Sequence, residues 1–232
     1  MIGKMIAVVQ SSYIPWKGYF DLIAAVDEFI LLDDVQYTAQ NWRNRNRIKT
    51  PHGVIWLTVP VKHVWLKQHI KDVRIDGSYW ARKHWKSLNA NYARTPYFDL
   101  YAPWLESLYL EHSYTMLSDM NRAFIISICD KLGIHTPIRC STEFDLPYEP
   151  NARLIALCEH TQADVYVSGP AAREYLDVDR FKSQQKSVRW FDYSGYPCYS
   201  QKWGDFDHNV SILDLLFNCG PDAPDFMKNV RD

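Results

Sequence analysis

The chain has 232 residues, a length that allows one substantial domain or two small ones. Apolar residues make up 47% and charged residues 23%, which excludes a disordered tail, a fibrous repeat and a disulfide-stapled mini-protein. The 26 Lys and Arg balance 27 Asp and Glu, so no global field recruits nucleic acid or an anionic membrane. Aromatic residues reach 15%, and so many rings beside polar residues suit a pocket that stacks on sugars or bases.

Signals for membrane insertion or export are not seen in the sequence. No window reaches the ~18 apolar residues that a membrane span needs, and the apolar run at 5–9 is too short for the core of a signal peptide. The 5 cysteines are an odd number without a CxxC pair, which is typical of reduced thiols buried as small apolar residues. We therefore expect a cytoplasmic protein with no membrane span.

Two short apolar runs with a helical pattern between them predict a βαβ unit. Residues 5–9 and 29–32 have the composition of buried strands, and residues 18–26 carry apolar side chains at helical spacing. Strands connected in this way are parallel, with a right-handed crossover. Ligands of such units bind beyond the carboxyl ends of the strands. The loops at 10–16 and 33–37 are therefore expected to border a site.

The next segment predicts a β-hairpin over about residues 42–60. Residues 42–49 alternate so that four cations share one face of an extended segment. A turn signal at 50–53 and an apolar strand at 54–59 complete the pattern. A further strand is predicted at 70–75.

Helical patterns dominate the middle of the chain and predict a helical insertion at about 78–133. Strands and helices then alternate again as far as a terminal helix at 211–218. We therefore predict an α/β fold. It is one Rossmann-like domain over residues 1–232, with a mostly parallel sheet, the hairpin and the helical insertion.

The loop before the first helix is the first candidate site. Amides at a helix N-terminus suit a phosphate, and a lysine adds a cation beside them. The placement is similar to that of the HxGH signature of nucleotidyltransferases, although neither histidine is present. The alternative is a proline-bracketed turn with buried rings. The binding residues predicted here are Gln10, Tyr13, Trp16, Lys17 and Tyr19.

Two adjacent carboxylates at the end of the second strand form the second candidate. Such carboxylates can hold Mg²⁺, orient a cation or act as a base. Neighbouring strand residues point to opposite faces, so at most one of the two enters a given pocket. The alternative is that one caps a loop and the other pairs with the arginines that follow. We assign Asp34 as a candidate base, with Asp33, Gln36 and Tyr37 as binding residues.

The cation-rich strand of the hairpin is the third candidate. Arginines interleaved with asparagines, near aromatic rings, suit phosphate or carboxylate recognition with stacking. A solvated charged face and an RNA-binding strip are the alternatives. The predicted binding residues are Trp42, Arg43, Asn44, Arg45, Asn46 and Lys49.

The segment at 80–87 supplies a candidate general acid or base, His84. Lys83 and Lys86 are expected to lower its pKa and keep it neutral near pH 7, unless it is simply a surface histidine on a basic helix. We assign His84 and Lys83 as catalytic candidates, and Trp80, Ser168 and Gly169 as binding residues. The histidines and cysteines show no metal-ligand spacing, so no metal site is predicted.

Together these segments resemble the WbqC-like family, which is named for a protein of O-antigen gene clusters. The matching segments are residues 9–23, 32–37, 42–50, 57–61, 80–84, 166–169, 175–177 and 211–218. Ser11 stands where the family usually has proline, and Tyr196 stands where it often has histidine before Pro197. The second departure argues against a catalytic histidine at that position.

The resemblance implies an enzyme of surface-polysaccharide or amino-sugar metabolism that modifies a small molecule, a nucleotide-linked sugar. With no redox motif or nucleophile elbow, group transfer by positioning and acid–base help is the natural class. The leading hypothesis is a transferase that moves an acyl or aminoacyl group to an amino-sugar nucleotide, with tRNA as one candidate donor. The alternatives are a nucleotidyl-transferring or adenylate-forming enzyme, and a non-catalytic or RNA-binding protein. The cofactor and the oligomeric state are left open.

Overall fold

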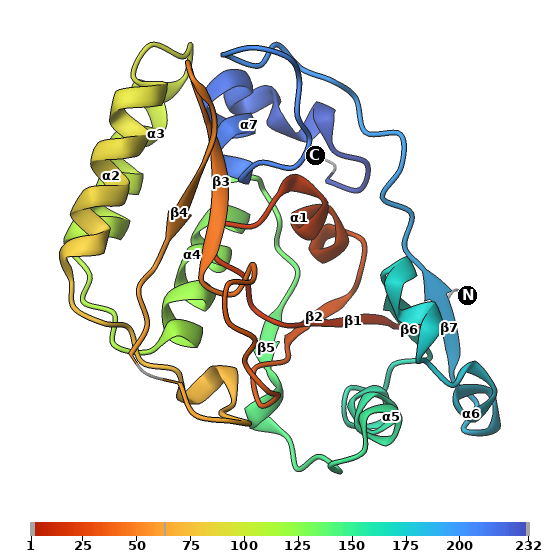
Figure 1. Ribbon diagram of the computed structural model, residues 1–232. Helices are drawn as coiled ribbons and strands as arrows, with labels where there is room; N and C mark the ends of the chain where they lie inside the picture. Colours follow the sequence, from red (N-terminus) through yellow and green to blue (C-terminus); the bar gives the residue numbers. More distant parts are fainter. Residues whose placement is uncertain (1–2, 63, 231–232) are drawn as a thin grey trace.

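The structure is a computed structural model that describes residues 3–62 and 64–230. Its centre is a five-stranded sheet with the strand order β5-β2-β1-β6-β7 (Figure 1). All neighbouring strands in it run parallel. The strands are β1 (Met5–Val9), β2 (Glu28–Leu31), β5 (Ile138–Cys140), β6 (Val165–Ser168) and β7 (Ser187–Trp190). The predicted α/β fold with a mostly parallel sheet is confirmed.

The strand order reverses between β1 and β6. The chain first builds β1, helix α1 (Lys17–Ala24) and β2, then reaches β5 at one edge of the sheet, and returns to β6 on the other side of β1. Ile6 to Val9 pair with Glu28 to Leu31, and Met5 to Ala7 pair with Val165 to Val167. In open α/β sheets, ligands bind beyond the carboxyl ends of the strands at such a reversal.

Buried side chains cover both faces of the sheet, as the side-chain alternation of a strand requires. Ala7 and Phe29 belong to a large core cluster that includes residues of α1 and of the helices inserted after the hairpin. Ile6 and Ile30 belong to a smaller cluster on the other face, which includes residues of α5 (Pro150–His160) and α6 (Val178–Ser183). A sheet covered on both faces exposes its loops at the strand ends, where a site can form.

The predicted hairpin and helical insertion are both present. Strands β3 (Arg45–Thr50) and β4 (Gly53–Thr58) form a separate antiparallel pair, which lies between α1 and α2 in Figure 1. The inserted helices are α2 (Tyr79–Tyr92), α3 (Phe98–Leu110) and α4 (Leu117–Lys131), and α7 (Ile212–Cys219) follows near the end of the chain. Within the described residues, no helix is long and apolar enough to cross a membrane.

The prediction of a strand at 70–75 is wrong. A short 3-10 helix, η1 (Ile70–Asp72), begins this segment, and the later residues form only isolated bridges, from Ile75 to Val61 and from Arg74 to Met116. Ile70 and Val73 are both fully buried, whereas Lys71 between them is exposed. A spacing of three between buried residues belongs to a helical turn, not to a strand. The remaining 3-10 helices are η2 (Ser141–Glu143), η3 (Pro170–Glu174) and η4 (Gly220–Phe226).

Candidate functional site

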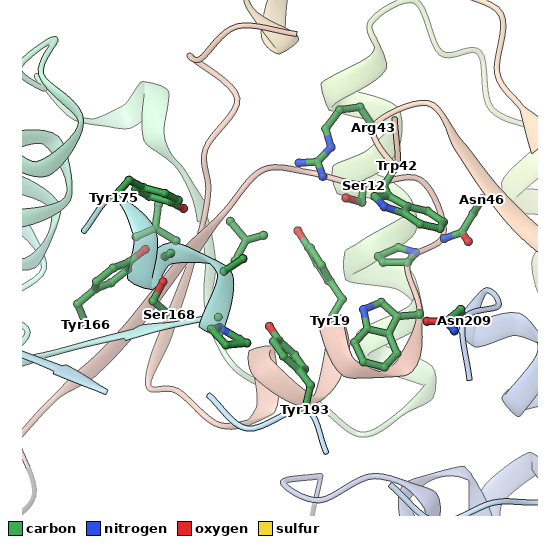
Figure 2. A pocket seen from close by; sticks show the side chains of 18 residues that line it. Ser12, Tyr19, Trp42, Arg43, Asn46, Tyr166, Ser168, Tyr175, Tyr193 and Asn209 are labelled. Atoms are coloured by element: carbon green, nitrogen blue, oxygen red, sulfur yellow. The ribbon is translucent and has the colours of Figure 1, made fainter. Parts of the chain in front are cut away.

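A cavity of about 620 Å³ opens at the carboxyl ends of β1 and β6, at the reversal of strand order. The loop after β1 and the residues that follow β6 form opposite sides of it. Figure 2 shows Tyr166, Ser168 and Tyr175 facing Trp42 and Asn46 across this space. The sheet edge that the βαβ pattern predicted is therefore a concave surface. We call this cavity the edge pocket.

The hairpin holds the loop after β1 in a strained conformation. Ile14 has a φ of 38°, which is unusual for a β-branched residue. The Asn46 side-chain amide donates hydrogen bonds to the carbonyls of Tyr13 (3.1 Å) and Ile14 (2.8 Å). The Tyr13 backbone amide donates to the Trp42 carbonyl at 2.9 Å. Asn46 thus both positions the loop and lines the edge pocket.

Aromatic rings form one wall of the edge pocket. The Trp16 ring lies against Gly18 so closely that any side chain at position 18 would overlap it, which explains the glycine. The ring centroids of Trp16 and Tyr193 are 5.5 Å apart. Tyr19 comes from the first turn of α1, and its hydroxyl and that of Tyr193 point into the pocket in Figure 2. Such a wall offers ring faces and hydroxyl groups to a sugar or a base.

Arg43 is the cation of the edge pocket. Its Nη1 donates to the Gln10 side-chain oxygen at 2.5 Å, and its buried Nε has no hydrogen-bond partner. Within residues 3–62 and 64–230, no carboxylate oxygen lies within 4.0 Å of the guanidinium. Burial lowers the pKa of Arg43, whereas Tyr19 and Asp33 raise it. The guanidinium therefore keeps donors for a phosphate or a carboxylate.

Asp33 lies behind this arginine, buried at the end of β2. Its carboxylate accepts a hydrogen bond from the Ser11 backbone amide at 2.9 Å. Burial raises the pKa of Asp33, and the Ser11 hydrogen bonds and the Arg43 charge act in the opposite direction. Asp33 thus ties the loop after β1 to β2 and supplies a negative charge near Arg43.

A second cavity, of about 690 Å³, adjoins the first. Arg43, Tyr166 and Tyr175 line both cavities. Asp34 lines only the second, where its carboxylate accepts from the Ser141 hydroxyl at 2.5 Å and lies 3.4 Å from Arg153 Nη1. Of the two adjacent carboxylates, one therefore faces a cavity and the other is buried. We call this second cavity the side pocket.

The structure brings about half of the predicted site residues to these two pockets. The edge pocket is lined by Trp16, Tyr19, Trp42, Arg43, Asn46, Ser168 and Gly169. The side pocket is lined by Gln10, Asp34, Gln36 and Arg43. The other predicted residues line neither pocket: Tyr13, Lys17, Asp33, Tyr37, Asn44, Arg45, Lys49, Trp80, Lys83 and His84.

His84 lies in the core, not on the surface. Its Nδ1 is 2.9 Å from the Tyr13 hydroxyl, and its Nε2 is 3.2 Å from the Thr58 carbonyl oxygen. Burial lowers the pKa of His84 to about 4, with Lys83 a smaller contribution in the same direction. Trp80 packs edge-on against His84, and Lys83 is exposed on α2. The pKa is shifted in the expected direction, but the main cause is burial and not the neighbouring lysines.

Two lysines that were predicted to bind a ligand, Lys17 and Lys49, instead donate hydrogen bonds to other groups of the chain. Lys17 Nζ donates to the Pro197 carbonyl at 2.9 Å, and burial lowers the pKa of Lys17 to about 8. Lys49 Nζ donates to the Gln201 side chain at 2.9 Å. Arg45 lies over the Trp56 ring, with its guanidinium carbon 4.3 Å from the ring centroid. Of the cation row in the hairpin strand, Arg43 is thus the member that lines the pockets.

Two other predicted residues are buried in the hairpin and the β2 loop. The Asn44 side-chain amide donates to the Val59 carbonyl at 2.9 Å, which joins the two sides of the hairpin. The Tyr37 hydroxyl is buried and has no hydrogen-bond partner among the residues that the structure describes. Burial raises the pKa of Tyr37.

Several lining residues were not predicted. Ser12, Tyr166, Tyr175, Tyr193 and Asn209 line the edge pocket, and Lys67, His69, Tyr148 and Arg153 line the side pocket. Tyr166 and Tyr175 lie in segments that match the family, which could have identified them. Ser12 also lies in a matching segment, at 9–23, whereas the others belong to segments without a motif, with Arg153 on α5. In the part of the chain that the structure describes, no group of three or more His, Cys, Asp or Glu side chains could hold a metal ion.

A doubly wound parallel sheet with concave surfaces at its strand reversal defines a Rossmann-like α/β protein. The chain belongs to the WbqC-like protein family, whose model matches residues 10–226. It is 50% identical over 229 residues to the uncharacterized protein Rv1507c of Mycobacterium tuberculosis, covering 98% of this chain and 99% of that protein. No solved structure matches the chain at a significant level. The predicted family membership is confirmed.

Proposed function

We propose that this protein is a cytoplasmic group-transfer enzyme of surface-polysaccharide or amino-sugar metabolism that binds a nucleotide-linked amino sugar in the edge pocket. The observation that carries the proposal is the position of Arg43. It is a partly buried guanidinium without a carboxylate partner among the described residues, in a pocket with an aromatic wall at the strand reversal. A diphosphate beside a sugar and a base has the charge and the ring surfaces that match this arrangement.

In this proposal Arg43 contacts the phosphate oxygens of the nucleotide-linked sugar. The rings of Trp16, Trp42 and Tyr193 stack on the base or the sugar. The Tyr19 hydroxyl donates to the Gln10 carbonyl at 3.2 Å, which holds its ring beside Arg43. These side chains position the substrate, and positioning is the main source of acceleration in a transfer reaction between two bound molecules.

The transferred group in this proposal is an acyl or aminoacyl group. The amine nitrogen of the sugar attacks the carbonyl carbon of an activated acyl donor and forms a C–N bond. The bond from that carbon to the leaving group breaks, and the leaving group keeps the electron pair. The proton lost by the amine passes to a base. Asp34 is the candidate base: it lines the side pocket, which adjoins the edge pocket, and Ser141 and Arg153 fix its orientation.

Nucleotidyl transfer is the second candidate, because a Rossmann-like sheet with its site at the strand reversal also suits a nucleoside triphosphate. We place it second because the cation that it needs at the start of α1, Lys17, donates its hydrogen bond to the Pro197 carbonyl. His84 lines neither pocket, so we assign it no contact with the substrate.

The test is thermal stability against UDP- and dTDP-linked amino sugars, ATP, CTP, acyl-coenzyme A and tRNA. A ligand at a hundred times its dissociation constant stabilises the folded chain by about 2.7 kcal/mol, which shifts the melting temperature measurably. We expect a shift with a sugar nucleotide. A shift with ATP or CTP alone would support nucleotidyl transfer instead, and a shift with tRNA alone would support RNA binding.

Two variants make the test specific. Arg43→Gln should weaken sugar-nucleotide binding about tenfold to a hundredfold, because a charged hydrogen bond contributes about 1.5–3 kcal/mol. Arg45→Gln is the matched control, since Arg45 lies two residues away over the Trp56 ring and lines neither pocket. Equal loss of affinity in both variants would contradict a phosphate contact at Arg43.

A further inference from the structure

The side pocket differs from the edge pocket in chemistry. Among the described residues, Arg43 is the charged residue that lines the edge pocket, whereas the side pocket is lined by Lys67 and Arg153 in addition to the shared Arg43. These cations come from separate parts of the chain: the turn before β3, the loop before η1, and α5. A group of cations from separate elements suits an anion whose charge is spread over several oxygens.

Only part of this positive charge is neutralised within the chain. Asp34 is the carboxylate that lines the side pocket, and it pairs with Arg153 at 3.4 Å. Among residues 3–62 and 64–230, neither Arg43 nor Lys67 has a carboxylate oxygen within 4.0 Å. The side pocket therefore carries an excess of positive charge.

The loop that carries Lys67 is held in place. Lys67 has a φ of 66°, a left-handed conformation that costs free energy for a residue with a Cβ. The next residue anchors it: the Gln68 carbonyl accepts from the Tyr37 backbone amide at 2.8 Å, and the Gln68 side-chain amide donates to the Asp72 carbonyl at 2.7 Å. Strain that persists under such constraints is typical of functional positions.

Side chains, not helix amides, must hold an anion here. The first turn of α5 borders the side pocket, but the Glu149 carboxylate already accepts from the amides of Asn151 (3.0 Å) and Ala152 (2.8 Å). Tyr148 and Tyr175 also line this pocket, and they are 86% and 67% exposed. Exposed rings beside a group of cations are suited to stacking on a nucleotide base.

We propose that the side pocket binds the diphosphate of a second, nucleotide-bearing substrate, while the nucleotide-linked sugar occupies the edge pocket. This inference rests on the proposed function, because a group transfer needs two substrates side by side. Arg43 lines both pockets and contacts both molecules. The shared chemistry is a nucleoside diphosphate group, and its sources are an acyl-coenzyme A or a nucleoside triphosphate.

The experiment uses ADP as the probe for the side pocket. Calorimetry measures the affinity of the full chain for ADP, with and without a saturating UDP-linked amino sugar. We expect ADP to bind in both cases, because the side pocket has lining residues of its own, Lys67 and Arg153 among them, that do not line the edge pocket. Titrations of an acyl-coenzyme A and of ATP then identify the source, as the true substrate should bind more tightly than ADP.

Variants assign the two ligands to the two pockets. Lys67→Asn should weaken ADP binding about tenfold and leave the sugar nucleotide unaffected, and asparagine tolerates the left-handed backbone at this exposed position. Trp42→Ala should have the opposite selectivity. Lys71→Asn, which removes an exposed lysine of η1 outside both pockets, is the matched control. A single cooperative thermal unfolding transition verifies that each variant folds.

The outcomes separate this inference from the proposed function. Competition between ADP and the sugar nucleotide would overturn the inference, and so would an equal effect of Lys67→Asn and Lys71→Asn on ADP binding. Binding of the sugar nucleotide without any binding of ADP would overturn the inference alone. Binding of ADP without any binding of a sugar nucleotide would overturn the proposed function.

Discussion

The edge pocket and the buried cluster of Tyr13, Trp80, His84 and Tyr109 are built from the same kinds of residue, aromatic rings with a few polar groups. In the cluster the chain satisfies its own polar atoms. The Tyr13 hydroxyl contacts both His84 Nδ1 and the Tyr109 hydroxyl, and His84 Nε2 lies near the Thr58 carbonyl oxygen. In the edge pocket Arg43 retains donors that the chain does not use. Residue type therefore does not distinguish these two regions, whereas the internal partners of their polar groups do.

The loop after β1 contributes to both regions. The Tyr13 ring is fully buried and packs edge-on against Trp80 and Phe124. Trp16, three residues later, lines the edge pocket. The two regions thus share one short segment, and a change on one side can be compared directly with a change on the other.

The largest contrast is expected between two tryptophans. Trp80 is 6% exposed in the cluster, and Trp42 is 41% exposed at the edge pocket. Trp80→Ala should lower the free energy of unfolding by about 3–5 kcal/mol, the cost of a cavity in a packed core. Trp42→Ala should cost about 1 kcal/mol, the contribution of its ring pair with Trp56. Urea denaturation of both variants measures the difference, and equal losses would contradict the assignment of Trp80 to the core and of Trp42 to the pocket.

The second prediction concerns the pH dependence of stability. The pKa of His84 is lowered to about 4 by burial, against about 6.5 for an unfolded histidine. The unfolded chain therefore binds a proton that the folded chain does not between these pH values, and stability falls as the pH decreases from about 6.5 to about 4. The loss assigned to His84 is about 3 kcal/mol in total.

His84→Asn isolates this contribution, because asparagine keeps a polar side chain that cannot titrate. The variant should lose less stability than the wild type between pH 7 and pH 4, as measured by chemical denaturation at each pH. The carboxylates titrate in both proteins, so the difference between the two curves belongs to the histidine. Parallel curves would show that His84 gains its proton as readily in the folded chain as in the unfolded one.

A smaller effect is expected for single hydroxyl groups. Tyr13→Phe removes the hydroxyl that contacts His84 and Tyr109, and it should cost about 1–3 kcal/mol because their buried polar atoms lose a partner. Tyr193→Phe is the matched change in the edge pocket, where the hydroxyl points into open space (Figure 2). It should leave stability within about 0.5 kcal/mol of the wild type. A melting temperature that falls further for Tyr193→Phe than for Tyr13→Phe would reverse the comparison.

The sequence was sufficient to predict those parts of the fold that depend on local patterns. The apolar runs at 5–9 and 29–32 and the alternation at 42–49 have the periods of their elements, and β1, β2 and β3 form there. The prediction of a strand at 70–75 failed because the apolar residues of this segment, Ile70, Val73 and Ile75, are spaced by three and then by two. Its structure depends on partners elsewhere, Val61 and Met116, that no local pattern identifies.

The location of the candidate site was also predictable, because ligands bind beyond the carboxyl ends of parallel strands. The direction in which each side chain points was not predictable from the sequence. Tyr13 points into the core because its hydroxyl contacts Tyr109 and His84 there, and both belong to helices of the distant insertion. Lys67 and Arg153 reach the side pocket from segments without a motif, so only the folded chain identifies them.

The smallest effect is expected at Lys83, a catalytic candidate next to His84 in the sequence. It is exposed on α2 and lines neither pocket. Lys83→Ala should change the free energy of unfolding by less than about 0.5 kcal/mol, since no buried partner is lost. It should also leave the affinity for a sugar nucleotide unchanged, as measured by calorimetry beside Arg43→Gln. A tenfold loss of affinity in Lys83→Ala would place a ligand over α2, and the edge pocket would then not be the site that the comparison describes.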